Sequence, residues 1–459
     1  MKRVRLTLLL LLLPWSYTAA STLDEYIVLG IKGNLALKEQ EISLQKSLEV
    51  LEQAKGLFFP SLVLDARYSW AGGGRVIDFP VGDLLNPIYK NLNDLFRFHG
   101  INAGLPTDIQ NQSFPFYRAQ EHETKLRLIQ PLFQPAILHN YRLQSSLAKM
   151  SAIELSAFKR RLVLDIKGAY YTYLKALEVM AVLNQTRLLL EENLRVSDSL
   201  FKNGKATEDV VFRARAEISG LEQKMAEAGK NQVQAVSYFN FLINRPLTEP
   251  VTVAEPVPQA TGSRDLAAAQ KNALAHRDEL EQMVYALKAV SHQKGLADSR
   301  GLPSLTAVLD YGFQGETYRL KGDDDYWMLS LVLSWTLFDG GQTRAMRAQA
   351  RLERRKLETR EMALSRQVEL QVQEEFYALE AARLGLEAAR ERERSANSSF
   401  EIVAKKYRYG MAPQVEYLDA QTTLTGAAVN RAISRFDYLI QEARFAWAAA
   451  LDDINRYID

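Results

Sequence analysis

Four short segments of this chain alternate between apolar and polar residues, which is the period of a β-strand. In the segment 327–335 every second side chain is large and apolar, and a tryptophan stands at each end. A strand that crosses a lipid bilayer needs about 10 residues and often carries aromatic side chains at the two interfaces. The pattern therefore predicts a membrane strand whose lipid-facing side chains are Trp327, Leu329, Leu331, Leu333 and Trp335.

Segments 61–70 and 304–314 repeat this pattern, and segment 124–132 repeats it until Gln130 interrupts its apolar face. A half-buried sheet on a water-soluble core gives the same alternation and is its commoner source. Charged and small hydroxyl side chains on the polar faces, together with the aromatic ends, favour the membrane interpretation. The lipid-facing residues predicted in these segments include Leu62, Leu64, Tyr68, Trp70, Leu309, Tyr311 and Phe313.

Most of the remaining sequence predicts very long helices. The windows 136–245 and 304–412 contain no proline, and both are rich in charged residues, alanine and leucine. Helices over about 135–201 and 341–409 would each be roughly 100 Å long at 1.5 Å per residue. Helices of that length need neighbouring helices beside them, so the pattern predicts coiled-coil packing.

The two halves of the chain resemble each other. The segment 201–204 (FKNG) recurs as 407–410 (YRYG), and in each half a helix and two strands precede the long helix, the glycine turn and a further helix. We therefore predict a first structural repeat over 21–245 and a second over 264–459. The stretch 246–263 between them contains four prolines, which predicts an extended connector.

The first 20 residues have the composition of a secretory signal peptide. Basic residues are followed by a leucine-rich run and then by small residues at 18–20. The alternative, a membrane anchor helix, needs about 20 apolar residues, more than this run provides. We therefore expect residues 1–20 to direct export.

Composition argues against several classes of function. The chain has no cysteine, and its net charge of +2 with 24% charged residues does not favour nucleic-acid binding. The five histidines show no metal-ligand spacing, and no nucleophile motif is present. We therefore expect no metal site, no cofactor and no enzymatic activity.

Four strands cannot close a barrel by themselves, and an unpaired strand edge is not tolerated in lipid. Several copies of the chain must therefore combine, most simply as a cyclic assembly of identical subunits. Two copies would give eight strands with a filled interior, whereas three would give twelve strands and a pore.

With these features the sequence resembles the TolC family of outer-membrane factors over essentially the whole mature chain. In that family each glycine turn opens a motif similar to Gly-x5-Asp-Val-Leu-x-Ala-x3-Leu. The segment 410–424 matches it with Glu416 at the acidic position and tyrosine in place of valine. The first copy, which begins at Gly204, is looser and has Val210 at the acidic position.

This resemblance implies a mainly α-helical homotrimer with a twelve-stranded membrane β-barrel and a long α-helical barrel in the periplasm. The implied function is a passive outer-membrane exit duct for efflux or type I secretion in a Gram-negative bacterium. The implied partners are a periplasmic adaptor protein, an inner-membrane pump of the RND or ABC type, and outer-membrane lipid. Gly204 and Gly410 would lie at the periplasmic tip where the adaptor docks, at turns that need positive φ.

The resemblance also suggests which residues form the closed aperture. Glu416 and Asp419 match the acidic constriction of the family, and their spacing of three places them on one helix face. A trimer would repeat them into a ring of carboxylates that attracts cations. Tyr407 matches a position that latches the aperture, but Ala412 occupies the place of its arginine partner. The alternatives are an ordinary solvated helix face for the acids and a packed helix-end tyrosine.

Two other functions are compatible with part of the sequence. A periplasmic coiled-coil adaptor or scaffold without a pore would share the helices, but it has no use for a row of outward leucines at 329, 331 and 333. An exported enzyme lacks a catalytic constellation in this sequence. The glycine-rich segment 71–74 and the acidic segment 323–325 are interpreted as tips of external loops, the first of which, 71–123, is long and rich in Gly, Pro and Asn.

Overall fold

The computed structural model describes residues 23–253 and 265–457. The predicted signal peptide, 1–20, lies outside these residues, as does the part of the predicted connector at 254–263. The chain divides into two compact units, which we call the helical unit and the strand unit. The strand unit consists of Leu51–Arg142 and His292–Ala350, and the helical unit contains the rest of the described chain.

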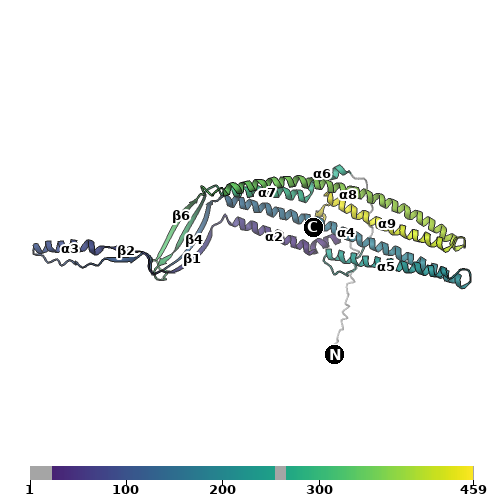
Figure 1. The fold of residues 1–459 in the computed structure, drawn as a ribbon, viewed down its shortest axis with the longest axis horizontal. Coiled ribbons are helices and arrows are strands. Elements are labelled where there is room, and N and C mark those ends of the chain that lie inside the picture. The colour runs from purple at the N-terminus through teal and green to yellow at the C-terminus, as the bar shows by residue number, and fades with distance from the viewer. Residues whose placement is uncertain (1–22, 254–264, 458–459) are drawn as a thin grey trace, which may run out of the picture. The chain divides into compact units, whose positions relative to one another are not determined.

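Helices make up most of the helical unit, and parts of α2, α4, α7 and α8 also belong to the strand unit. The two longest, α4 (Pro135–Lys202) and α8 (Gln342–Arg408), have 68 and 67 residues, which corresponds to about 100 Å each (Figure 1). The predicted long helices are therefore confirmed. Within the described ranges, no helix combines the length and the apolar character needed to cross a membrane. The other helices outside the β1–β4 connection are α1 (Leu23–Gly33), α2 (Leu35–Gly56), α5 (Asp209–Leu242), α6 (Leu266–His276), α7 (Asp278–Ser299), α9 (Gln414–Ala448) and the 3-10 helix Ile454–Tyr457.

Each half begins with two helices where the sequence predicted one. Asn34 separates α1 from α2, and its side chain caps the first turn of α2 and donates to the carbonyl oxygen of Leu242 at 2.8 Å. Arg277 separates α6 from α7, and its guanidinium lies 4.3 Å from the ring centroid of Trp447 and donates to the carbonyl oxygen of Ala448. Both interruptions are stabilised by contacts with the last helix of the same half, which a local sequence pattern does not report.

The core of the helical unit is rich in aromatic residues. Tyr26, Tyr170 and Phe239 contact one another, and the rings of Tyr26 and Phe239 meet edge to face with centroids 5.1 Å apart. Burial raises the pKa of Tyr170 to about 12, because its phenolate would lose the hydration that it has in water. This cluster joins α1, α4 and α5, so the first half is held together by packing.

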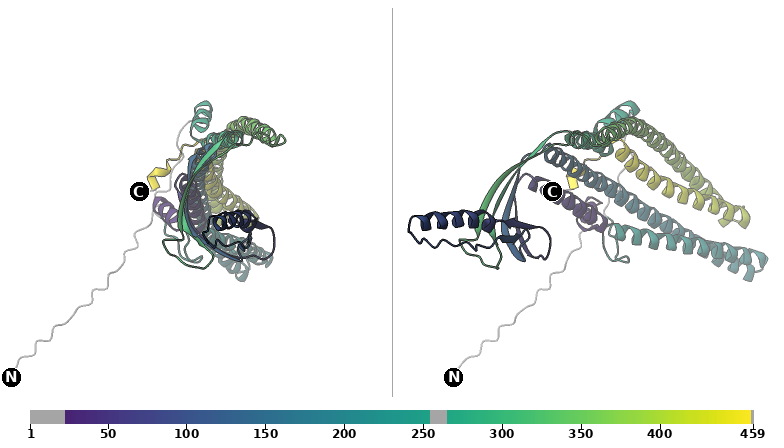
Figure 2. Two further views of the ribbon diagram at one scale, coloured as in Figure 1. Left: turned by 90° about the vertical axis from the view of Figure 1, so that its left-hand side faces the viewer. Right: turned by 60° about the vertical axis from the view of Figure 1, so that its left-hand side comes forward.

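The strand unit contains an antiparallel sheet of four strands in the order β1-β4-β5-β6 (Figure 2). The two halves of the chain meet where β4 pairs with β5. Within the described residues, β1 and β6 each pair on one side only. The strands are β1 (Ser61–Trp70), β4 (Gln120–Phe133), β5 (Ser304–Gly315) and β6 (Asp325–Ser334).

The predicted long loop 71–123 contains secondary structure of its own. A short hairpin of β2 (Val76–Phe79) and β3 (Gln112–Pro115) encloses the helix α3 (Val81–Phe98). Strand β4 already begins at Gln120, so the connection is shorter than predicted. The abundance of glycine, proline and asparagine concealed an 18-residue helix.

Candidate functional site

The apolar side chains that were predicted to face lipid lie on one face of the sheet. Along each strand, side chains two residues apart point to the same face. Across the strands, the register places these side chains opposite one another, so they form rows that cross all four strands. Many are widely exposed, for example Leu62 at 65%, Leu331 at 66% and Trp327 at 72%. One row contains Leu62, Leu128, Leu309 and Leu329, and the next contains Leu64, Leu126, Tyr311 and Trp327.

The remaining predicted membrane-facing residues lie on the same face or at its ends. The rings of Tyr68 and Trp70 contact each other near the far end of β1, with centroids 4.6 Å apart and ring planes tilted by 56°. Phe313 is half-buried on β5, and Leu333 is exposed on β6. Trp335 was predicted to be part of the strand, but β6 ends at Ser334, and the Trp335 indole Nε1 donates to the carbonyl oxygen of Gly301 at 3.1 Å.

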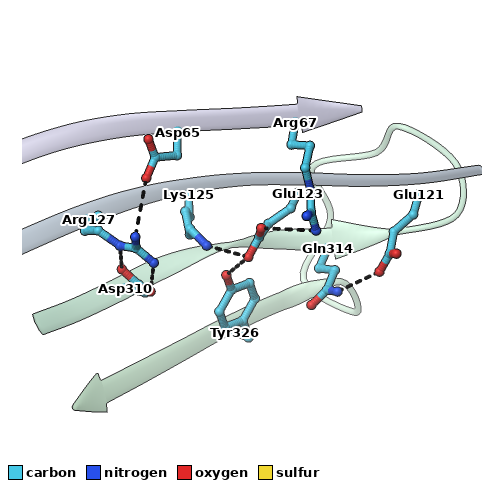
Figure 3. Close-up of polar contacts among 9 residues, drawn as sticks. All are labelled: Asp65, Arg67, Glu121, Glu123, Lys125, Arg127, Asp310, Gln314 and Tyr326. Atoms are coloured by element: carbon cyan, nitrogen blue, oxygen red, sulfur yellow. Dashed lines mark hydrogen bonds and ion pairs between the residues drawn. The ribbon is translucent and has the colours of Figure 1, made fainter. Parts of the chain in front are cut away.

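The opposite face of the sheet carries paired charges (Figure 3). Arg127 on β4 makes a two-pronged contact with Asp310 on β5, from Nε to Oδ1 at 2.8 Å and from Nη2 to Oδ2 at 2.9 Å. Asp65 on β1 lies on the other side of the same guanidinium, at 3.9 Å. Only 1% of Asp310 is exposed, so its charge depends on Arg127 for compensation.

A second group of charges continues this face toward the far end of the strands (Figure 3). The Glu123 carboxylate accepts from Lys125 Nζ at 2.7 Å and from the Tyr326 hydroxyl at 2.6 Å, and Arg67 lies 3.7 Å away. Gln314 donates to Glu121 at 2.7 Å. The polar face therefore holds charges of both signs that largely compensate one another across the strands.

The two glycine turns have the same backbone conformation. Gly204 has φ 67° and Gly410 has φ 72°. In each turn the glycine N–H donates to the carbonyl oxygen three residues earlier, and the next N–H donates to the carbonyl oxygen five residues earlier. This hydrogen-bond pattern ends a helix in a left-handed residue, which explains the preference for glycine.

Gly410→Val is expected to destabilise the helical unit by about 1–2 kcal/mol, the strain of a left-handed L-residue. A Cβ at this position meets no atom within 4 Å, so the strain comes from the backbone alone. The measurement is chemical unfolding followed by circular dichroism in detergent. Gly385→Val is the matched control, because Gly385 lies inside α8 with equally open space and no positive φ. Equal unfolding midpoints for the two variants would contradict the assigned role of the turn.

Glu416 and Asp419 lie in the first two turns of α9, directly after the second glycine turn. Both are exposed, and among the described residues neither carboxylate has a hydrogen-bond or ion-pair partner. In the first turn the equivalent positions, six and nine residues after the glycine, are Val210 and Arg213. The acidic pair is therefore a property of the second hairpin only.

Tyr407 is packed at the end of α8. Its ring stacks on that of Tyr417 with centroids 4.9 Å apart, and Phe400 contacts Tyr417 from another side. Burial also raises the pKa of the Tyr417 hydroxyl. These contacts agree with the alternative interpretation, in which Tyr407 is a packed tyrosine at a helix end. A latch role for Tyr407 stays a prediction.

Sequence reasoning missed Gln414, the residue that joins the two hairpins near their turns. Its side chain is buried, and Nε2 donates to Ser197 Oγ at 3.0 Å and to the carbonyl oxygen of Val210 at 2.9 Å. It also lies 3.3 Å from Asn193 Oδ1. A glutamine at the start of a helix is usually solvated, so no local signal marked it.

A groove of about 820 Å³ runs along the helical unit between α4, α5 and α9. Its lining is mostly apolar, with polar groups such as Thr186 and Gln421. The described residues include no cluster of three or more His, Cys, Asp or Glu side chains arranged to hold a metal ion. The candidate site therefore consists of surfaces: a two-faced sheet, two glycine turns with an acidic pair, and a helical groove.

The sequence and the fold are similar to those of known outer-membrane proteins. Residues 269–451 match the family model described as outer membrane efflux protein. The chain is 21% identical over 424 residues to the outer membrane protein TolC of Salmonella enteritidis, covering 90% of this chain and 79% of that protein. It is 22% identical to the alkaline protease secretion protein AprF of Pseudomonas aeruginosa, covering 72% of this chain and 70% of that protein.

A solved structure shares the fold. The crystal structure of the Campylobacter jejuni CmeC outer membrane channel superposes with a TM-score of 0.77, covering 95% of this chain and 88% of that one, at 18% identity. At this level of identity the likeness shows the fold and leaves individual residue roles to be tested.

Proposed function

Because this chain is a member of the TolC family of outer-membrane factors, we infer that it is the outer-membrane channel of an efflux or type I secretion system. It resides in the outer membrane of a Gram-negative bacterium and extends into the periplasm. We propose that it acts as a passive conduit and not as an enzyme.

The observation that carries this proposal is the two-faced sheet. Exposed leucine and tryptophan rows cover one face, whereas paired charges cover the other. Such a sheet suits a wall between hydrocarbon and water. We propose that the first face contacts lipid and that the second lines an aqueous lumen.

The edges of the sheet require further copies of the chain. In lipid the outer edges of β1 and β6 need hydrogen-bond partners, and β6 of one copy can supply the edge that β1 of the next copy needs. Three copies of four strands would close a twelve-stranded barrel with an open interior. We propose a homotrimer on this basis.

We propose that a periplasmic adaptor docks at the Gly204 and Gly410 turns and along the groove between α4, α5 and α9. A helix with an apolar face is the natural occupant of an apolar groove. The adaptor would connect the channel to an inner-membrane pump of the RND or ABC type. A pore-free scaffold, the alternative function, gives no reason for the exposed leucines at 329, 331 and 333.

The proposal is tested by fractionation and by planar-bilayer recording. The protein should stay with outer membranes after carbonate washing, run as a trimer in mild detergent, and give discrete conductance steps in a lipid bilayer. A carbonate-soluble monomer without conductance would establish the scaffold alternative instead.

A further inference from the structure

The connection between β1 and β4 carries an ordered helical insertion. Strand β1 is entered from α2 and strand β4 leads into α4, so the insertion joins the strand ends that lie away from both helices. On the proposed function this is the external end of the barrel. The insertion contains β2, α3 and β3.

One face of α3 is occupied by the chain that follows it. Asn86 donates to the carbonyl oxygen of Ile109 and accepts from its N–H, both at 2.9 Å. Asn93 makes the same pair of bonds with Leu105, at 2.7 and 2.8 Å. Each asparagine thus completes the hydrogen bonds of one returning residue, which fixes the returning segment along this face of the helix (Figure 1).

The opposite face of α3 is apolar and uncovered. The side chains on it are spaced by four, three, four and three residues, which keeps them within a narrow stripe on a helix of 3.6 residues per turn. Asn86 and Asn93 lie about half a turn away from this stripe. The stripe contains Leu84, Ile88, Asn91, Leu95 and Phe98, and its apolar members are 64%, 52%, 53% and 86% exposed.

The charges on α3 argue against a lipid surface as the partner of this stripe. Helices that lie on anionic membranes are rich in lysine and arginine on their polar face. Here Lys90 and Arg97 are balanced by Asp83 and Asp94. The stripe therefore lacks the basic flanks that a lipid headgroup layer would attract.

The spacing of the stripe favours a second copy of the same helix. A 4-3-4-3 repeat is the seam of a coiled coil, and the equivalent helices of a cyclic assembly run in the same direction, so identical stripes can meet. A three-fold assembly supplies three identical stripes at a common axis. A polar residue in the seam, here Asn91, is a known means of fixing register at some cost in stability.

We propose that the α3 helices of three copies pack in parallel around the three-fold axis and form a helical cap over the outer mouth of the channel. Leu84, Ile88, Leu95 and Phe98 face the axis. This inference rests on the proposed trimer.

Single cysteines test the cap, because the chain has no cysteine of its own. Ile88→Cys and Leu95→Cys should each give a disulfide-linked dimer band in outer membranes treated with copper phenanthroline. One disulfide joins two of the three chains of a trimer, so the linked fraction should approach about two thirds of the protein. Lys90→Cys is the control, since residue 90 is exposed and lies about a third of a turn from the stripe. It should stay largely unlinked.

The trimer is measured separately by native mass spectrometry of each variant. An intact trimer that gives no dimer band with the cysteine at 88 or 95 would overturn the cap and leave the proposed function standing. Equal linking at position 90 would have the same consequence, because the contact would then not follow the stripe. If the trimer is intact and unlinked and a water-soluble maleimide labels neither Cys variant, at 88 or at 95, the stripe is covered by something other than a second α3, which also overturns the cap. Absence of the trimer would count against the proposed function itself.

Discussion

Replacing Glu416 and Asp419 together by alanine is expected to remove most of the cation preference of the channel. Both carboxylates are exposed at the start of α9, and two per chain would give six in a trimer. A ring of one sign concentrates cations and excludes anions. Charged constrictions raise local counter-ion concentration by about tenfold or more, so the cation-to-anion permeability ratio should fall by about that factor. Reversal potentials in planar bilayers under a KCl gradient measure it.

The same recordings separate this role from that of an ordinary solvated helix face. Block by divalent cations should weaken in the double variant, because a ring of carboxylates is also a cation-binding site. Glu374→Ala is the matched control, since Glu374 is an exposed acid far from the turn on α8. If the permeability ratio and the divalent-cation block are both unchanged in the double variant, Glu416 and Asp419 lie on an ordinary solvated helix face and do not form a constriction.

Arg127→Met is expected to reduce the yield of folded trimer severalfold and to lower its unfolding temperature. The substitution keeps a long side chain but leaves the Asp310 carboxylate, 1% exposed, without its cation. An uncompensated buried charge destabilises a fold far more than the loss of an exposed pair. Trimer yield after refolding into detergent and heat-dependent gel mobility measure the effect.

Arg67→Met provides the comparison for this prediction. Its side chain is 64% exposed and reaches Glu123 at 3.7 Å, so its removal should have little effect. The double variant Arg127→Gln with Asp310→Asn should recover much of the loss, because two neutral amides can hydrogen-bond across the strands. If Arg127→Met and Arg67→Met lower the trimer yield and the unfolding temperature equally, the buried Arg127–Asp310 pair contributes no more to stability than an exposed pair.

The sequence predicted the elements whose signals are local. Alternation of large apolar residues identified the strands and the side chains that share their apolar faces, and the long proline-free windows identified α4 and α8. The positive φ at Gly204 and Gly410 followed from glycine at the end of a helical pattern. Each of these inferences uses residues within a few positions of one another, where the period of the backbone decides which side chains share a face.

The sequence failed where local signals were mixed. Asn34 and Arg277 interrupt helices because of partners on distant helices. The segment that contains α3 was judged by its content of glycine, proline and asparagine, yet Pro87 lies inside the helix. The insertion was therefore predicted as a loop, and the stripe on its outer face was not foreseen.

What the sequence determined by itself is most of the elements and the apolar side chains that share one face of each strand. The tertiary structure alone decided the partners. Arg127 meets Asp310 across 183 residues of sequence, and Gln414 reaches α4 across 217. Periodicity is written into neighbouring positions, whereas strand register and buried hydrogen bonds depend on how distant segments align, and a single sequence does not encode that alignment in any short window.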